Sequence, residues 1–293
     1  MKITVFTPTY NRAYIIRNLY ESLKKQTCKN FEWLIVDDGS TDNTEELIKS
    51  WIEEDNKFTI RYYKQSNGGK CRAINKGLNL AQGELFFTVD SDDYLTDDAI
   101  EKMVMWESEL PKVGKYCGIA GNLGTSRSET INRKFEGRYY EGTLLDRYKI
   151  VDGERAIAIY TAIHRKYKYP EFDGEKFMTE ATVWNRMAND GYKMRFYNDI
   201  IWIYEYREDG LTKSGNMLFL KNPKGYGLWL REKAKFENIS LSEKLKMYYT
   251  FTCDLSGRYD IKLIAECIGA PVSVIGIFNI LHIFYNKMRE RQR

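Results

Sequence analysis

Cysteine and histidine are scarce in this 293-residue chain, and their scarcity excludes several kinds of site. The five cysteines include no CxxC pair, which argues against a disulfide framework and against a zinc site. Two histidines, His164 and His282, are too few for a histidine-rich metal centre. The first residues run directly into a strand-like segment, KITVFT, without the pattern of a signal peptide. We therefore expect a protein of the reducing cytosol.

Two glycine-rich phosphate-binding patterns are also missing. No GxGxxG follows the first predicted strand and no GxxxxGK[ST] occurs anywhere, which argues against a dinucleotide oxidoreductase and a P-loop phosphotransferase. The formal net charge of +4 is small and its basic residues are scattered, so nucleic acid is not indicated. With 43% hydrophobic and 29% charged residues, the composition is that of a soluble globular protein.

Strand-like and helix-like segments alternate along the first hundred residues. Apolar runs at 3–7, 33–38, 58–64 and 85–89 alternate with helical patterns at 14–23, 39–52 and 71–81. In the second helical pattern, Asp42 with Glu45 three residues later predicts a helix start. Short links between the segments indicate βαβ units, and so an α/β fold with a parallel sheet covered on both faces.

The pattern is looser beyond residue 106. A strand is expected at 116–123, a helix at 179–190, and one long strand or a strand pair at 193–206. From about residue 216 the chain is expected to be helical.

Each of the first four predicted strands is followed by a polar, turn-forming segment. These segments are PTYNR, DDGS, QSNGGK and DSDD, in chain order. Ligands of open parallel sheets bind beyond the carboxyl ends of the strands. We therefore expect the four segments to converge at one edge of the sheet.

The residue types at this edge fit a nucleoside diphosphate. Asp38 could accept a hydrogen bond from the imide N–H of a pyrimidine while the ring of Tyr10 covers the base. Asp90 and Asp92 could hold a divalent cation, because Mg²⁺ and Mn²⁺ prefer oxygen ligands. The base would then lie at the second strand, and the diphosphate and metal at the fourth.

The loop motifs, taken together, resemble those of a known protein family. TPTYNR, VDDGSTDNT, NGGKCRAINKG and GELFFTVDSDDYL resemble, in order and spacing, the family 2 glycosyltransferases of bacterial surface-polysaccharide type, over roughly the first 105 residues. The resemblance implies a GT-A fold, a Rossmann-like, mainly parallel sheet with helices on both faces, here followed by a C-terminal helical extension. It also implies inverting transfer of a sugar from a nucleoside diphosphate, expected to be a UDP-sugar, to a glycan or lipid-linked acceptor.

The resemblance also implies roles for single residues. In that family the DxD aspartates bind ribose and metal, and the base is held by the first-strand Tyr and the second-strand Asp. The expected donor-binding residues are Pro8, Tyr10, Asp37, Asp38, Lys70, Arg72, Asp90 and Ser91, with Asp90 and Asp92 as ligands of Mn²⁺ or Mg²⁺. Two alternatives stay open, since Asp37 could instead bond the backbone of its turn and Asp93 could cap the segment that follows.

The catalytic base is expected on the acceptor side. GEKFMTEATVWNRM resembles the acceptor-side motif of some bacterial members, which implies Glu180 as the base that takes the proton of the incoming hydroxyl. Asp173 and Glu175 lie close enough in sequence to compete. Many relatives carry a Glu-Asp pair where Ala181 follows Glu180 here, and many carry Arg where this chain has Ile74. The phosphate contacts of that Arg are then expected from Lys70 or Arg72.

Three regions are expected along the chain. Residues 1–105 would form the nucleotide-sugar-binding half and residues 106–212 the acceptor-binding half of one GT-A domain, with a helical region at 213–293. The segment YREDGLT at 206–212 either closes over a ligand or forms a plain turn. The apolar run 263–285 precedes a basic tail, and its helix should break before Pro271, leaving about fifteen residues. That helix would lie on the inner membrane face or pack on the core or on a second subunit of a homodimer.

Two other functions remain as alternatives. A catalytically inactive nucleotide-sugar-binding module is one, because of the Glu180–Ala181 departure. A phosphatase of the haloacid dehalogenase type, which also places DxD after a buried strand, is the other. That phosphatase normally has Thr or Val where this chain has Tyr94, and it leaves VDDGS and NGGK without a role.

Overall fold

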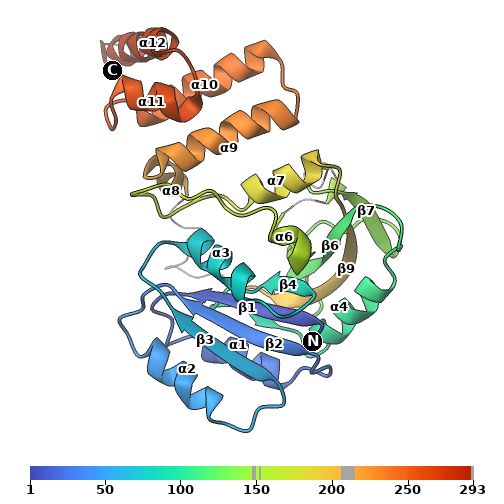
Figure 1. Ribbon diagram of the computed structural model, residues 1–293. Coiled ribbons are helices and arrows are strands. Elements are labelled where there is room, and N and C mark those ends of the chain that lie inside the picture. The colour runs from blue at the N-terminus through green and yellow to red at the C-terminus, as the bar shows by residue number, and fades with distance from the viewer. Residues whose placement is uncertain (147–149, 152, 206–214, 292–293) are drawn as a thin grey trace. The chain divides into compact units, whose positions relative to one another are not determined.

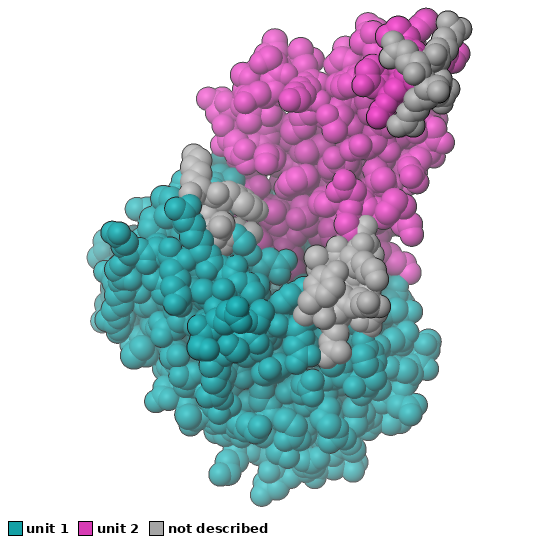
Figure 2. Space-filling view, turned by 180° about the vertical axis from the view of Figure 1, so that it is seen from behind, with its two compact units in different colours: residues 1–169, 186–208 teal, residues 170–185, 209–293 magenta. Residues whose placement is uncertain are grey.

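The computed structural model describes residues 1–146, 150–151, 153–205 and 215–291, and its helices and strands are labelled in Figure 1. The chain divides into two compact units (Figure 2). The first unit consists of residues 1–169 and 186–208, and the second of residues 170–185 and 209–293. The second unit therefore contains a short internal segment as well as the whole carboxyl end.

The alternation predicted for the first hundred residues is confirmed. The elements in chain order are β1 (Ile3–Thr9), α1 (Arg17–Lys24), β2 (Phe31–Asp37), α2 (Thr44–Ile52), β3 (Thr59–Lys64), α3 (Lys70–Leu80) and β4 (Leu85–Thr88). The strands lie in the order β3-β2-β1-β4 and all three neighbouring pairs are parallel. Their carboxyl ends therefore share one edge of the sheet.

Beyond β4 the sheet continues with antiparallel as well as parallel pairs. The further elements of this unit are β5 (Tyr94–Leu95), α4 (Ala99–Ser108), β6 (Tyr116–Gly124), β7 (Tyr139–Thr143), β8 (Ala156–Tyr160), α6 (Thr161–His164) and β9 (Lys193–Ile203). β8 joins both β4 and β6 in antiparallel fashion, β6 and β9 are parallel, and β5 and β7 both pair antiparallel with β9. The run expected at 193–206 is thus one long strand in a mixed sheet.

Helices cover both faces of the parallel strands (Figure 1). On one face, α1, α2 and α4 pack into a continuous buried core. This core includes a ring stack in which Tyr20 lies 4.3 Å from Trp51 and 5.9 Å from Trp33, between centroids. On the opposite face α3 lies close to β1, and a Cβ atom at Gly77 would overlap the ring of Phe6. Glycine at this position allows the close approach of helix and strand.

Helices are the only regular elements of the second unit among the residues described. They are α8 (Asn216–Leu220), α9 (Pro223–Phe236), α10 (Leu241–Leu255), α11 (Ile261–Ile268) and α12 (Val272–Arg291), and α7 (Ala181–Asn189) begins in this unit. A capping box starts α10, in which Ser240 and Glu243 each accept a hydrogen bond from the backbone N–H of the other. The core of the unit is formed by Leu230, Phe251, Leu255, Ile264, Ile268 and Ile275 with their neighbours.

The helix break expected before Pro271 is present, and the chain after it is helical, as expected. α11 ends at Ile268, and Gly269 has a φ of 66°, the left-handed conformation that favours glycine at a helix end. α12 then runs for 20 residues and continues beyond the apolar run, which ends at residue 285, into the basic tail. Lys and Arg are good helix formers and are favoured near a helix C-terminus.

Among the residues described, no single helix has both the length and the apolar character needed to span a membrane. The α11–α12 pair reaches that length and hydropathy only when the two helices are taken together, and they are bent by 118°.

Histidine 164, on α6, is buried in the first unit without a hydrogen bond to either ring nitrogen from the described chain. Its ring meets the Phe86 ring edge-on, with centroids 5.6 Å apart. Burial lowers the pKa of His164 from 6.5 to about 3. Folding therefore favours the neutral ring. Its contribution to the free energy of unfolding is complete above the unfolded-state pKa and is lost as the pH falls toward 3.

We expect His164→Phe to make the free energy of unfolding less sensitive to pH between 6 and 4. The difference in slope from wild type should be at most ~1.4 kcal/mol per pH unit, the value for one proton. Urea denaturation of both proteins across this range measures the slopes, and parallel curves would contradict the expectation.

Candidate functional site

The four predicted loops leave the same edge of the sheet. Thr9 lies opposite Asp37 in β2, and Asp37 lies opposite Lys64 in β3. On the other side of β1, the Val89 N–H donates to the Phe6 carbonyl at 2.8 Å. The convergence predicted from the motifs is therefore confirmed for the loops after β1, β2, β3 and β4.

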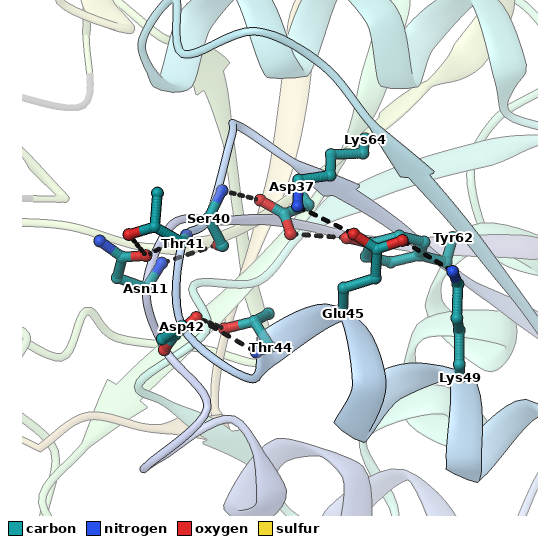
Figure 3. Close-up of polar contacts among 10 residues, drawn as sticks. All are labelled: Asn11, Asp37, Ser40, Thr41, Asp42, Thr44, Glu45, Lys49, Tyr62 and Lys64. Atoms are coloured by element: carbon teal, nitrogen blue, oxygen red, sulfur yellow. Dashed lines mark hydrogen bonds and ion pairs between the residues drawn. The ribbon is translucent and has the colours of Figure 1, made fainter.

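The first two loops are joined by side chain to backbone hydrogen bonds (Figure 3). Asn11 has a φ of 54°, a conformation that Asn tolerates better than most residues. Its N–H donates to the Ser40 hydroxyl at 2.8 Å, and its Oδ1 accepts from the Thr41 N–H at 2.8 Å. The Ala13 N–H donates to Asp42 Oδ2 at 3.1 Å. These bonds fix the PTYNR loop against the DDGS loop.

The start of α2 differs from the expected Asp42–Glu45 pair. The helix begins at Thr44, whose N–H and hydroxyl both donate to Asp42 Oδ1. Glu45 pairs instead with Lys49 at 2.7 Å and with Lys64 at 2.8 Å (Figure 3). Hydrogen bonds from these two lysines lower the pKa of Glu45 to about 2. The helix therefore begins one residue later than an N-cap at Asp42 implies. Asp42 still bonds the first residue of the helix, whereas Glu45 pairs with two lysines.

Asp37 is fully buried and bonds the turn that follows β2. Its Oδ1 accepts from the Ser40 N–H at 2.7 Å, and its Oδ2 accepts from the Tyr62 hydroxyl at 2.6 Å (Figure 3). Burial, and then the Asp37 hydrogen bond, raise the pKa of Tyr62. The geometry is that of the alternative role, in which Asp37 supports the fold of the loop.

Asp38 holds the third loop. Its Oδ1 accepts from Gln65 Nε2 at 2.7 Å and from the Gly68 N–H at 2.9 Å, and its Oδ2 accepts from the Gly69 N–H at 2.7 Å. A carboxylate accepts about four hydrogen bonds. Within the described chain, one lone-pair direction on Oδ2 is therefore left for a further donor such as an imide N–H.

Lysine 70 connects the third loop to the fourth. It is the first residue of α3, and its Nζ lies 2.8 Å from Asp90 Oδ1. Arg72 lies against Gly68, where an added Cβ would meet its Cδ at 2.8 Å. Ile74 is 1% exposed and belongs to the core. Lys70 and Arg72, the two basic residues expected at the diphosphate, thus border the third loop. Ile74 is buried and does not reach the surface of that loop.

Asp90 and Asp92 are the more accessible carboxylates of the fourth loop, with side chains 39% and 20% exposed. Burial, and then the charge of Asp90, raise the pKa of Asp92. Arg12 opposes this shift from the first loop, with its Nη2 3.8 Å from Asp92 Oδ2. Ser91, between the two aspartates, is buried.

Asp93 does not cap a following element, as the alternative for it supposed. It is buried and accepts hydrogen bonds from the Trp202 indole N–H at 2.8 Å and the Glu205 backbone N–H at 3.3 Å. Burial, followed by the charges of Asp90 and Asp92, raises the pKa of Asp93 to about 8. Its carboxyl group therefore anchors the end of β9 to the fourth loop.

The acidic pair offers part of a metal site. Among the described residues, no group of three or more His, Cys, Asp or Glu side chains could hold a metal ion alone. Asp90 and Asp92 do supply carboxylate oxygens. A divalent cation would relieve the repulsion between them, which adds to the burial that raises the pKa of Asp92. The residues thus fit a cation that takes its other ligands from a bound diphosphate and water, as Mg²⁺ commonly does.

The remaining donor-side residues flank the first strand. Tyr10 follows β1 directly and is 49% exposed, so its ring is accessible to a ligand. Pro8 lies within β1 opposite Val36.

The three candidate bases belong to the second unit. Glu175 is buried, and its two carboxylate oxygens accept from the Lys224 N–H at 2.7 Å and the Gly225 N–H at 2.9 Å. It therefore satisfies N–H groups at the start of α9, which have no partner within that helix. Asp173 is exposed, whereas Glu180 is half-buried and directly precedes α7.

The side chains outside the predicted set that contact it include those of Arg12, Tyr62 and Gln65. Trp202 contacts Asp93, which follows the set directly. Arg12 and Gln65 stand within the loop motifs, so the motifs themselves contained the signal. Tyr62 and Trp202 lie inside strands, where nothing in the sequence separates them from ordinary core aromatics. The segment at 206–212 lies outside the described residues.

Comparison with known proteins establishes the family. The model of glycosyl transferase family 2 matches residues 4–167, which is more than half of the chain. The chain belongs to this family. It is therefore a glycosyltransferase, and the resemblance noted in its motifs is confirmed.

Curated relatives are similar over most of the chain. The glycosyltransferase GlyA of Streptococcus pneumoniae is 28% identical over 227 residues, which are 72% of this chain and 32% of GlyA. This chain therefore spans about a third of that relative. A GalNAc(5)-diNAcBac-PP-undecaprenol β-1,3-glucosyltransferase of Campylobacter jejuni is 25% identical over 259 residues, 86% of this chain and 79% of the relative.

Solved structures share the fold. Staphylococcus aureus TarS 1–349 in complex with UDP-GlcNAc has a TM-score of 0.62 at 19% identity, covering 98% of this chain and 92% of that one. The mannosyltransferase PcManGT of Pyrobaculum calidifontis, in complex with GDP-Man and Mn²⁺, has a TM-score of 0.57 at 18% identity, covering 99% and 82%. At these identities the likeness shows the GT-A fold alone.

We expect Tyr62→Phe to lower the free energy of unfolding by about 1–3 kcal/mol, because it leaves the buried Asp37 Oδ2 without its donor. The neighbouring Tyr63→Phe is the matched control. It removes a hydroxyl that accepts from Arg61, whose guanidinium also bonds Glu32 and the Leu80 carbonyl. Urea denaturation compares the two variants. Equal losses of the free energy of unfolding would show that the contact with Asp37 stabilises the fold no more than the contact with Arg61 does.

Proposed function

We propose that this glycosyltransferase is a metal-dependent, inverting enzyme of hexosyltransferase type. Its donor would be a UDP-sugar, and its acceptor a glycan or lipid-linked intermediate of surface polysaccharide synthesis. Two of the relatives support this choice, because one binds UDP-GlcNAc and the other is named for a PP-undecaprenol-linked glycan. A second copy of the chain, as a homodimer, is not required by this proposal.

The observation that carries the proposal is the pair of accessible carboxylates at the end of β4. Asp90 and Asp92 leave the same sheet edge as the loop of Asp38, and the basic groups of Arg12 and Lys70 lie beside them. A dianionic diphosphate with a divalent cation is a chemical match for such a mixed set of charges. We accordingly assign donor binding to residues 1–105 and acceptor binding to residues 106–212.

Each side of the donor would use a different part of the edge. The exposed ring of Tyr10 would cover the base, with Pro8 beside it, and the remaining Oδ2 lone pair of Asp38 would accept the imide N–H. Asp37 would act indirectly, by holding the turn in which Asp38 stands.

Next to the base, Asp90 and Ser91 would contact the ribose. Lys70 and Arg72 would face the diphosphate. Asp92, with Asp90, would hold Mn²⁺ or Mg²⁺, which when bound supplies positive charge to the departing diphosphate.

The transfer step requires a base for the acceptor hydroxyl. In the proposed step the hydroxyl proton passes to Glu180, and the hydroxyl oxygen attacks the anomeric carbon from the side opposite the diphosphate. The bond from the anomeric carbon to the diphosphate oxygen breaks, and UDP leaves with the electron pair. Glu175 is a poorer candidate because both its oxygens already bond the start of α9.

One alternative function is retained, a nucleotide-sugar-binding module without turnover, because Ala181 stands where many relatives have Asp. The phosphatase alternative is not retained, since the chain belongs to a glycosyltransferase family.

We expect UDP binding to depend on the metal and on Asp92. Calorimetric titration of wild type with UDP in Mn²⁺ should give binding that excess chelator weakens, and Asp92→Ala should lose at least on the order of tenfold in affinity. Asp97→Ala is the matched control, because it removes a nearby carboxylate that pairs with the exposed Arg127. UDP binding that ignores both chelator and Asp92→Ala would overturn the metal assignment, and tighter binding of GDP would overturn the donor assignment.

We expect Glu180→Gln to reduce sugar transfer by roughly 10²–10⁴-fold, the usual contribution of a general base, while UDP binding stays unchanged. The assay is UDP release from a panel of UDP-sugars, with a cell-envelope extract as the source of acceptor. Asp173→Asn is the control and should be close to wild type. Loss of activity in Asp173→Asn instead would assign the base to Asp173. A wild type that binds UDP without any turnover would favour the binding module.

A further inference from the structure

One side of helix α12 packs into the second unit. Ile275 is fully buried, the Phe278 ring meets the Tyr249 ring edge-on at 5.7 Å, and Asn279 accepts a hydrogen bond from the Ser256 hydroxyl at 2.6 Å. Residues 275, 278 and 279 are spaced as neighbours on one helix face. This face is what attaches α12 to α10 and the rest of its unit.

The other side of α12 is apolar and exposed. Its residues are Ile277, Ile280, Leu281, Phe284 and Met288, each between 53% and 64% exposed. We call these five residues the outer stripe. Their spacing of three, four, seven and eleven residues from the first places them on one helix face, turned away from Ile275. Single exposed apolar residues are ordinary on a protein surface, but a contiguous stripe of this kind marks an interaction surface.

The net positive charge of the chain comes from the same end, which is poor in acidic residues. Residues 215–293 contain thirteen Lys and Arg against seven Asp and Glu, a formal excess of +6, although the whole chain carries only +4. The residues before 215 are therefore slightly acidic, at −2. Lys287 and Arg289, both exposed, lie in the last turns of α12 beside the outer stripe.

We propose that the outer stripe of α12 lies on an anionic lipid surface, such as the cytoplasmic face of the cell membrane. An amphipathic helix inserts its apolar face at the boundary of the headgroups, and basic residues next to it are attracted to anionic lipid. A second copy of the chain fits less well, because packing two outer stripes together would bring two regions of +6 against each other.

The helix lies on the lipid rather than crossing it. A span would need α11 together with α12, but Ile264, Cys267 and Ile268 of α11 are buried in the core of the unit. Exposing them to lipid would dismantle that core. The outer stripe is available to lipid without unfolding.

Co-sedimentation of the full chain with lipid vesicles tests the proposal without any sugar donor, so the result does not depend on the proposed function. Wild type should pellet with vesicles containing phosphatidylglycerol and much less with pure phosphatidylcholine. Ile280→Asn with Phe284→Asn should reduce the bound fraction at least on the order of tenfold. Lys287→Gln with Arg289→Gln should weaken binding on the order of tenfold and make it less sensitive to salt.

The matched control is Leu241→Asn with Leu245→Asn, two exposed leucines of α10 in the same unit, which should bind as wild type does. Thermal unfolding checks that the stripe variant is folded, and the charge variant tests the proposal independently if it is not. Absence of wild-type binding to the anionic vesicles, or equal losses in the stripe and control variants, would overturn the proposal. Analytical ultracentrifugation without lipid tests the second copy. If wild type is a dimer and the stripe variant alone is a monomer, the outer stripe contacts a second copy and the lipid proposal is overturned as well.

Discussion

A buried carboxylate, Asp38, joins the strand ends on which the candidate site is built. Its backbone N–H donates to the Thr9 carbonyl of β1 at 2.8 Å, and its side chain accepts three hydrogen bonds from the loop that precedes α3. From the start of α3, Lys70 reaches Asp90 at the end of β4. The ends of four strands are thereby held by one connected set of contacts. Without a carboxylate at this position, the backbone amides of Gly68 and Gly69 would lose their acceptor. The conformation of the third loop would then be less stable.

The same contacts explain how several aspartates can stand together. Asp37 accepts hydrogen bonds from the Ser40 N–H and the Tyr62 hydroxyl, and Asp93 accepts them from the Trp202 indole and a backbone amide. Asp90 and Asp92 are left at the surface, where Lys70 and Arg12 balance them only in part. In a strand-end cluster of this kind, the aspartates that face the protein have structural partners. The aspartates that face solvent can still bind a cation. The proposed function requires both the structural and the cation-binding aspartates.

Much of the first unit could be predicted from the sequence because its first hundred residues follow local rules. Apolar runs alternate with helical spacing there, and loop motifs stand at fixed strand ends. The antiparallel strands β7 and β8 do not belong to that alternation, and their pairing depends on contacts between residues far apart in sequence. The same holds for single side chains. Nothing local distinguishes Glu175, which bonds the start of α9 some fifty residues later, from Glu180 beside it.

The central claim is that the edge formed by the ends of β1 to β4 holds a nucleoside diphosphate with its metal. A crystal structure of the chain grown with UDP and Mn²⁺, with data collected at the manganese absorption edge, tests it most directly. We expect an anomalous peak in contact with Asp92, a diphosphate between that peak and Lys70, and a uracil ring against Tyr10 with its imide N–H on Asp38. A nucleotide bound elsewhere, or manganese without contact to either Asp90 or Asp92, would contradict it.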